Sequence, residues 1–264
     1  MRLSITLLSL AGSLWLGYSA IPASTPPDGP RRAVIVELFT SEGCSSCPPA
    51  DALLQKLDQA QPVPGALVIA LSEHVDYWNN LGWKDPFSSA VYSRRQEAYG
   101  RRFRLDSVYT PQVVIDGNAE ALGSDARQVQ AAIRQATKMD KLEVRISPIF
   151  KNASGVATVH VEVDPSDTLA TQSRTRVILA LAENAVVSRV LRGENSGRKL
   201  DHVAVVRSLI DAGRLDRRPF SLDIPLTGEL DQWSGKRMIA FVQEQDFGRI
   251  YGAAYRVLPA SLPN

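Results

Sequence analysis

The sequence predicts an α/β domain followed by an all-β antiparallel sandwich domain, and two patterns support this. Over residues 33–138, apolar runs alternate with segments whose apolar residues recur at helical spacing. Over residues 141–260 the period changes to two, as where Leu142, Val144 and Ile146 alternate with polar residues. Roughly eight short strand candidates separated by turn residues are typical of a sandwich. We therefore predict a domain boundary between these two ranges.

The first domain should open with a strand–helix–strand unit. Residues 33–39 are apolar except for Glu37, which is typical of a strand covered on both faces. Residues 51–60 carry three leucines at helical spacing. Residues 66–71 form a second continuous apolar run and are expected to be the second buried strand.

A helix, a hairpin and a last helix should complete this domain. Ser88 or Ser89 is expected to cap a helix that stops at Gly100. An Asp-Gly-Asn turn should join two short strands, and Ser124 should cap the last helix. These four elements are expected at residues 89–99, 112–115, 119–122 and 125–136.

The two cysteines of the chain, Cys44 and Cys47, lie three apart directly after the first predicted strand. A C-x-x-C pair between a buried strand and a helix is the arrangement that thioredoxin-like proteins use for thiol–disulfide exchange. The order of strands and helices is also that of thioredoxin. We therefore predict a thioredoxin-like fold for residues 33–138. Cys44 is expected to attack from the exposed end of the strand, and Cys47 to resolve the mixed disulfide.

Two other uses of the cysteine pair stay open at this point. The pair could form an inert disulfide that staples the loop. It could also bind copper or zinc as thiolates together with His74, which follows the second strand and should lie at the same edge of the sheet. The expected cofactor is therefore none, with copper as the alternative.

Two further features bear on exchange chemistry. Thr110-Pro111 comes directly before the third predicted strand, where thioredoxin-like folds carry a cis-proline whose preceding residue pairs with the substrate backbone. We expect Thr110 and Pro111 to bind the substrate, with an ordinary trans-proline as the alternative. Glu37 is the one carboxyl in an apolar strand, and we predict either a proton shuttle for the resolving thiol or a solvent-exposed edge position.

The charge balance bears on the possible partners, and the N-terminus indicates an exported protein. Thirty basic and 28 acidic side chains give a net charge of +2, which argues against a nucleic-acid partner. Residues 1–23 combine a basic start with an apolar stretch too short to span a membrane, so we predict a signal peptide, with an uncleaved anchor as the alternative. Residues 24–32 form a proline-rich leader. Periplasmic or secreted localisation would place the cysteines in an oxidising compartment.

Four stretches of the chain resemble a secreted bacterial family known as domain of unknown function 1223. The stretches are Val36 to Asp51, which contains the C-x-x-C pair, His74 to Trp78, Tyr109 to Gln112, and His202 to Arg207. The resemblance implies a thioredoxin-like fold and covers essentially the whole chain after the predicted signal peptide. Compared with thioredoxin itself, the two prolines after Cys47 and the second domain are departures.

Together these features predict an exported thiol–disulfide oxidoreductase that acts on thiols or disulfides of exported proteins. No membrane span is expected after signal cleavage. A metal-binding protein and an interaction module with a structural disulfide are the alternatives.

Overall fold

The computed structural model describes residues 30–164, 174–226 and 233–259. The predicted signal peptide and most of the predicted leader lie outside these residues. The N-terminal half has the element order β1, α1, β2, α2, β3, β4, α3. Their bounds are Arg32–Thr40, Pro48–Ala60, Ala66–His74, Ala90–Phe103, Gln112–Ile115, Ala119–Leu122 and Ala126–Ala136.

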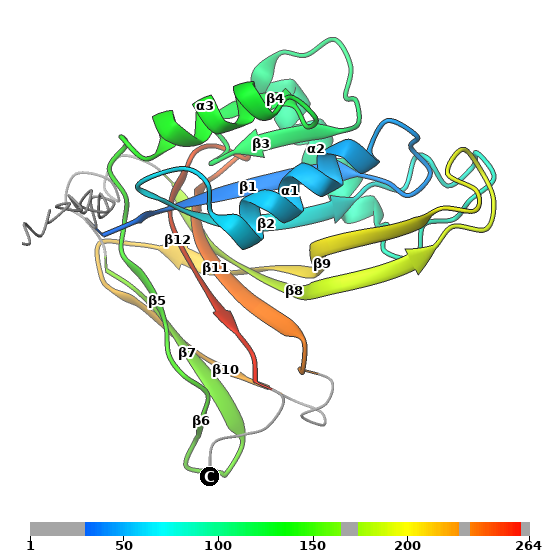
Figure 1. The fold of residues 1–264 in the computed structure, drawn as a ribbon. Coiled ribbons are helices and arrows are strands. Elements are labelled where there is room, and N and C mark those ends of the chain that lie inside the picture. The colour runs from blue at the N-terminus through cyan, green and yellow to red at the C-terminus, as the bar shows by residue number, and fades with distance from the viewer. Residues whose placement is uncertain (1–29, 165–173, 227–232, 260–264) are drawn as a thin grey trace, which may run out of the picture.

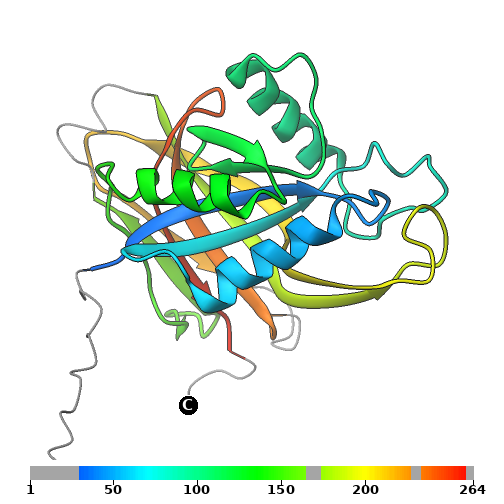
Figure 2. The ribbon, with the colours of Figure 1, turned by 45° about the horizontal axis from the view of Figure 1, so that its top comes forward.

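The four N-terminal strands lie side by side in the order β2-β1-β3-β4. β1 is parallel to β2 and antiparallel to β3, and β3 and β4 form a hairpin. Alternation along β1 sends Val34, Val36 and Leu38 into a core built with α1 and α3. The opposite face of β1 and β2 packs against Tyr92 and Tyr99 of α2. The sheet is therefore covered on both faces, with α1 and α3 on the same side (Figure 2).

The helix ends agree with the predictions only in part. Ser89 caps α2 by accepting a hydrogen bond from Val91 N, as predicted. α2 does not stop at Gly100 but continues to Phe103, whose ring stacks on that of Tyr99. The cap of α3 is Asp125 rather than Ser124, because the Asp125 carboxylate accepts two hydrogen bonds from the first turn.

The C-terminal half extends the same sheet instead of starting a separate one. Its main strands are β8 (Thr175–Arg189), β9 (Lys199–Leu215), β11 (Lys236–Glu244) and β12 (Ile250–Val257). The full order is β12-β11-β8-β9-β2-β1-β3-β4, and the two halves meet where β9 runs parallel to β2 (Figure 1). The sequence predicted a separate sandwich at 141–260. That prediction is wrong for β8, β9, β11 and β12. These four strands belong to the same sheet as the four N-terminal strands.

A small second sheet covers one face of the C-terminal strands. It contains β5 (Val144–Ile146), β7 (Ala157–Val163) and β10 (Phe220–Pro225), with β6 (Phe150–Lys151) paired to β7. Their inward side chains share a core with β8, β11 and β12. The two-layer packing that period two predicts is therefore present locally (Figure 1). The molecule is a mixed, sheet-dominated α/β fold.

Candidate functional site

The cysteine pair forms a disulfide at the junction of β1 and α1. Cys44 and Cys47 are bonded to each other, with their Cα atoms 5.4 Å apart. Cys47 is the N-cap residue of α1, and two prolines occupy the first helical positions, where a missing N–H costs no helical hydrogen bond. Both cysteines are 0% exposed, whereas Ser45 and Ser46 between them are exposed. The prediction that Cys44 lies at an exposed strand end is therefore wrong.

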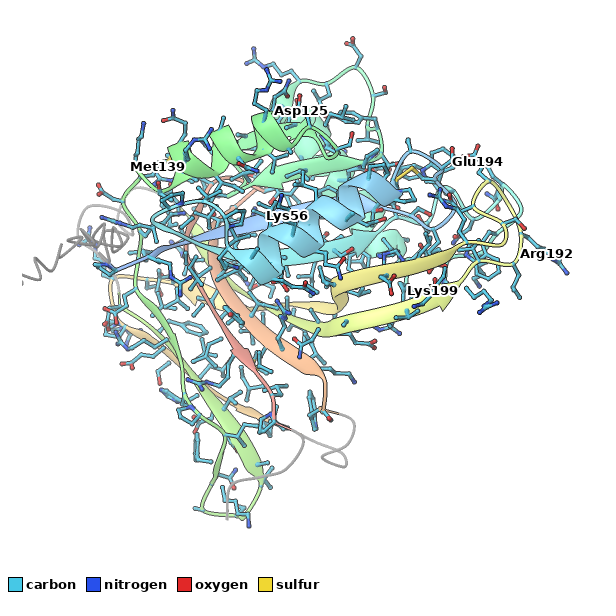
Figure 3. The ribbon with its side chains drawn as sticks, in the orientation of Figure 1. Lys56, Asp125, Met139, Arg192, Glu194 and Lys199 are labelled. Atoms are coloured by element: carbon cyan, nitrogen blue, oxygen red, sulfur yellow. A yellow bond between two sulfur atoms is a disulfide. The ribbon has the colours of Figure 1, made fainter. Side chains whose placement is uncertain are left out.

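The connection between β8 and β9 contacts the disulfide loop. The Asn195 side-chain amide donates 2.9 Å hydrogen bonds to the carbonyl oxygens of Glu42 and Cys44, and Asn195 itself is fully buried. The Glu194 carboxylate accepts a 3.0 Å hydrogen bond from Ser45 N. The Glu194 label in Figure 3 marks this connection beside the sulfur–sulfur bond at the start of α1. Sequence analysis did not identify either residue.

Thr110 and Pro111 lie next to the disulfide loop, and their peptide bond is cis as predicted. The Thr110 carbonyl oxygen is 3.5 Å from Ser46 Oγ, which in turn is 3.4 Å from Cys44 Sγ. Trp78 Nε1 donates a 2.9 Å hydrogen bond to the Thr110 hydroxyl. The polar backbone of Thr110 therefore lies beside the cysteine pair.

Glu37 lies in a buried ion-pair cluster on the α2 side of the sheet. Arg95 Nε donates to its carboxylate at 2.5 Å, and Tyr99 OH donates to it at 2.6 Å. Glu37 is 0% exposed, so the alternative of a solvent-exposed edge position is wrong. Its carboxylate is held by these donors, and it points away from the α1 side, on which Val36 and Leu38 lie. The proton-shuttle role of Glu37 stays a prediction, and the carboxylate has Arg95 and Tyr99 as its hydrogen-bond donors.

A second carboxyl, Glu73, shares Arg95 with Glu37. Arg95 Nε is 3.5 Å from Glu73 Oε1, and both side chains are buried. Burial raises the pKa of Glu73 well above 4.5, and the nearby Glu37 carboxylate raises it further, while Arg95 lowers it. One guanidinium thus serves two buried carboxyl groups, which favours a neutral, protonated Glu73.

A second buried cluster lies beside the disulfide loop, around His202 of β9. His202 Nε2 is 3.4 Å from Glu42 Oε1, and Nδ1 is 3.8 Å from Asp51 Oδ1. Burial by itself lowers the pKa of an imidazole, but the Asp51 and Glu42 carboxylates outweigh it and raise the pKa of His202 to about 10. The sequence signalled His202 only through the fourth family-like stretch.

His74 belongs to the same cluster. Its Nδ1 is 2.7 Å from Asp85 Oδ2, and its ring centroid is 4.8 Å from that of His202. The sulfurs predicted to join His74 in a metal site are bonded to each other. In the part of the chain that the structure describes, no group of three or more His, Cys, Asp or Glu side chains is arranged to hold a metal ion.

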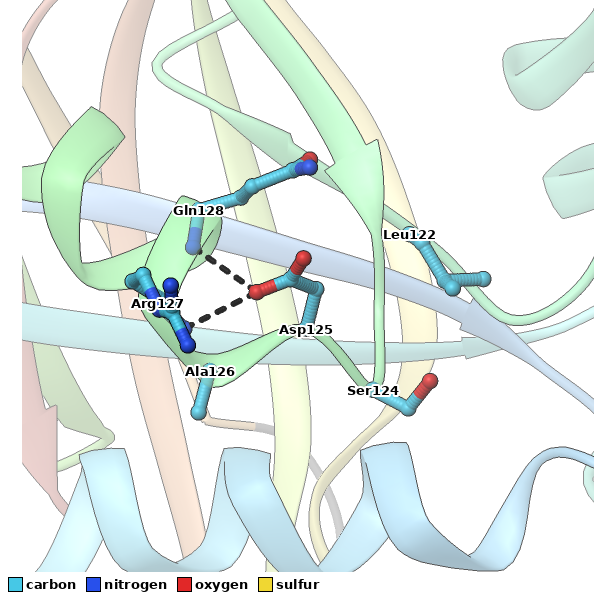
Figure 4. Close-up of a pocket in the computed structure, with 6 residues that line it drawn as sticks. All are labelled: Leu122, Ser124, Asp125, Ala126, Arg127 and Gln128. Atoms are coloured by element: carbon cyan, nitrogen blue, oxygen red, sulfur yellow. Dashed lines mark hydrogen bonds between the residues drawn. The ribbon is translucent and has the colours of Figure 1, made fainter.

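One cavity lies at the start of α3, and a smaller one lies beside α1. One of about 740 Å³ lies at the start of α3, where Asp125 accepts hydrogen bonds from Arg127 N and Gln128 N (Figure 4). A smaller one of about 200 Å³ lies between α1 and the start of β9, and its lining includes Pro48 and Asp51. The smaller cavity adjoins the disulfide-bearing turn of α1.

The family comparison covers both halves of the chain. Residues 35–243 match the family described as Protein of unknown function (DUF1223). The chain belongs to this family. The match extends from β1 to β11, as expected if the continuous sheet is the folded unit of the family.

Two solved structures share the fold. A crystal structure of a protein from Agrobacterium tumefaciens is 25% identical, with a TM-score of 0.68, and the match covers 89% of this chain and 98% of that one. HBP35 of Porphyromonas gingivalis is 14% identical, with a TM-score of 0.60 over 89% of this chain and 79% of that one, and shows the fold alone. A comparison with curated proteins gives no match. None of the helices within the described residues is long and apolar enough to cross a membrane.

Proposed function

We propose that this chain is an exported, thioredoxin-like thiol–disulfide oxidoreductase that acts on the thiols or disulfides of exported proteins. The observation that carries the proposal is the Cys44–Cys47 pair at the β1–α1 junction, beside the backbone of Thr110. A reactive pair needs the start of a helix, whose free N–H groups stabilise a thiolate. It also needs a nearby backbone group with which a partner chain can pair.

The topology supports the thioredoxin-like part of the proposal. The order β2-β1-β3-β4 joins a parallel pair to an antiparallel hairpin, with α1 and α3 on one face and α2 on the other. This arrangement places the C-terminal end of β1 at the edge where ligands bind in such sheets. The C-terminal strands are then an extension of that sheet, and their β8–β9 connection contributes to the site.

The proposed exchange needs no cofactor, because the two sulfur atoms of the pair accept both electrons. A partner thiolate attacks Cys44 Sγ, the sulfur–sulfur bond breaks, and its electron pair remains on Cys47 Sγ as a thiolate. The partner's second thiol, after losing its proton, attacks the mixed disulfide and releases Cys44. The partner dithiol is thereby oxidised by two electrons and the cysteine pair is reduced. Run in reverse, the same steps reduce a partner disulfide. Thr110 would hold the partner backbone during both attacks.

We also propose that the chain is exported. A disulfide persists in oxidising compartments, and the predicted signal peptide at residues 1–23 would direct the chain there. The periplasm or the extracellular medium is therefore the proposed location, and the partners are other proteins of that compartment.

The test is to trap the mixed disulfide in cells. Cys47→Ser removes the resolving thiol, so it should accumulate covalent, reductant-sensitive adducts with exported proteins. Cys44→Ser is the matched control and should give few adducts. If neither variant traps a partner, and the reduction potential of the pair lies below about −300 mV, the disulfide is a structural staple and the proposal fails.

A further inference from the structure

His202 connects the two carboxylates that flank the cysteine pair in sequence. Glu42 comes two residues before Cys44, and Asp51 comes four residues after Cys47, in the first turn of α1. His202 enters between them from β9, with ring nitrogens at 3.4 Å and 3.8 Å from their carboxylate oxygens. A residue from the C-terminal half therefore completes the electrostatic surroundings of the disulfide loop.

Each carboxylate also has neutral donors that fix its position. Trp83 Nε1 donates a 2.8 Å hydrogen bond to Glu42, and the Ser188 hydroxyl of β8 donates to the same carboxylate. The Thr40 hydroxyl at the end of β1 donates a 2.9 Å hydrogen bond to Asp51. These donors fix the positions of both carboxyl groups around His202.

The remaining neighbours of His202 come from β2 and the segment after it. The His74 ring lies 4.8 Å away between centroids, with its Nδ1 bonded to Asp85, and the Phe87 ring lies 6.0 Å away. Buried acids thus face the cluster from the β1–α1 loop, from α1 and, through His74, from Asp85. An imidazolium at His202 compensates charge that would otherwise lie uncompensated next to the disulfide.

We propose that His202 is a positioning residue of the cysteine pair: its positive charge, held between Glu42 and Asp51, favours the thiolate that disulfide exchange requires. The raised pKa of His202, which the two carboxylates cause against the effect of burial, keeps this charge in place at neutral pH. The inference rests on the proposed function, and it adds the group that sets thiolate formation.

The proposed effect on the thiolate comes from the electric field of the buried His202 charge. The leaving sulfur in the first exchange step carries a full negative charge, and the pair is shielded from water because both cysteines are buried. At protein-like dielectric constants, a buried unit charge in the surroundings of a thiolate changes its stability enough to alter its population about tenfold. Loss of the cation should therefore disfavour the thiolate, and loss of one anion should favour it.

The experiment compares two substitutions with opposite expected effects. The reduced full-length protein is titrated between pH 4 and pH 10 by thiolate absorbance in the ultraviolet. His202→Gln should lower the thiolate population at pH 7 by about tenfold, and Asp51→Asn should raise it by a similar factor. His160→Gln, at a half-exposed histidine of β7, is the matched control and should leave the titration unchanged.

The opposite signs separate an electrostatic role from a structural one. His202→Gln removes both ion pairs of the cluster and Asp51→Asn removes one of them, so a purely structural role would move thiolate formation in the same direction in both. The same direction in both variants, or no change in either, overturns the inference. If His202→Gln does not fold, Asp51→Asn decides alone, because a fall or no change in its thiolate population overturns it. The titration needs no partner protein, so its result is independent of trapping by Cys47→Ser.

Discussion

The side-chain amide of Asn195 donates a 2.9 Å hydrogen bond to the carbonyl oxygen of Cys44, across 151 residues of sequence. A second 2.9 Å bond from the same amide reaches the Glu42 carbonyl. The fully buried Asn195 thus fastens the β8–β9 connection to the loop that carries the disulfide. Both cysteines are 0% exposed, so a partner thiolate can reach the sulfurs only after the disulfide loop or its surroundings move.

Asn195→Ala should therefore make the disulfide easier to reduce. Removing two buried hydrogen bonds should lower the free energy of local opening by about 1–3 kcal/mol, which corresponds to a rate increase of about fivefold to 150-fold. The measurement is the rate of reduction by a small dithiol under native conditions. Asn152→Ala, in the turn between β6 and β7, is the matched control. Equal rates in wild type and Asn195→Ala would show that this contact does not limit access.

Glu73→Gln should stabilise the protein at alkaline pH more than at acidic pH. Because the pKa of Glu73 is raised in the folded state, the folded protein keeps a proton that the unfolded chain releases above pH 4.5. Folding stability due to Glu73 therefore falls as pH rises from that value towards the folded-state pKa, by about 1.4 kcal/mol per pH unit. Glutamine removes this dependence.

The check is the free energy of unfolding in urea at pH 5 and at pH 8. The advantage of Glu73→Gln should be clearly larger at pH 8. Glu143→Gln, at a carboxylate that is 69% exposed, should show little difference between the two conditions. An equal effect of Glu73→Gln at both values would contradict the raised pKa.

A fragment of residues 30–140 should not fold as an independent domain. In the full chain, Ile35 and Leu71 pack against Ile239 and Phe241 of β11 in one buried cluster. Exposing each such side chain to water costs about 1.5–3 kcal/mol of folding free energy. The loss of a few of them therefore equals the whole stability of a domain. Circular dichroism and amide-proton dispersion of the fragment are the measurements. A cooperative thermal transition in the fragment would instead restore the two-domain division.

Much of the N-terminal half could be predicted from local patterns. The apolar run of β1, the helical spacing of the leucines in α1 and the Ser89 cap depend on residues close together in sequence, and each is present. The cysteine pair lies at the predicted junction for the same reason. Local sequence did not show the true end of α2, because the stacking of Phe103 on Tyr99 outweighs the helix-stopping tendency of Gly100.

Other parts of the site depended on contacts between distant segments. Period two in the C-terminal half predicts strands but carries no information on their neighbours, so the pairing of β9 with β2 could not be read from it. The face on which Glu37 lies was also open, because a strand covered on both sides is apolar on both. Arg95 pairs with Glu37 from 58 residues away.

The sequence by itself determined the strands and helices of the N-terminal half, the place of Cys44 and Cys47 between β1 and α1, and the family. Only the tertiary structure decided that both cysteines are buried, that Asn195 contacts the disulfide loop, and that His202 lies between Glu42 and Asp51. The physical reason is that secondary structure and disulfide spacing follow from neighbouring residues. Burial and ion pairing instead follow from which strands meet, and here β9 brings residues from the far end of the chain to the edge of β2.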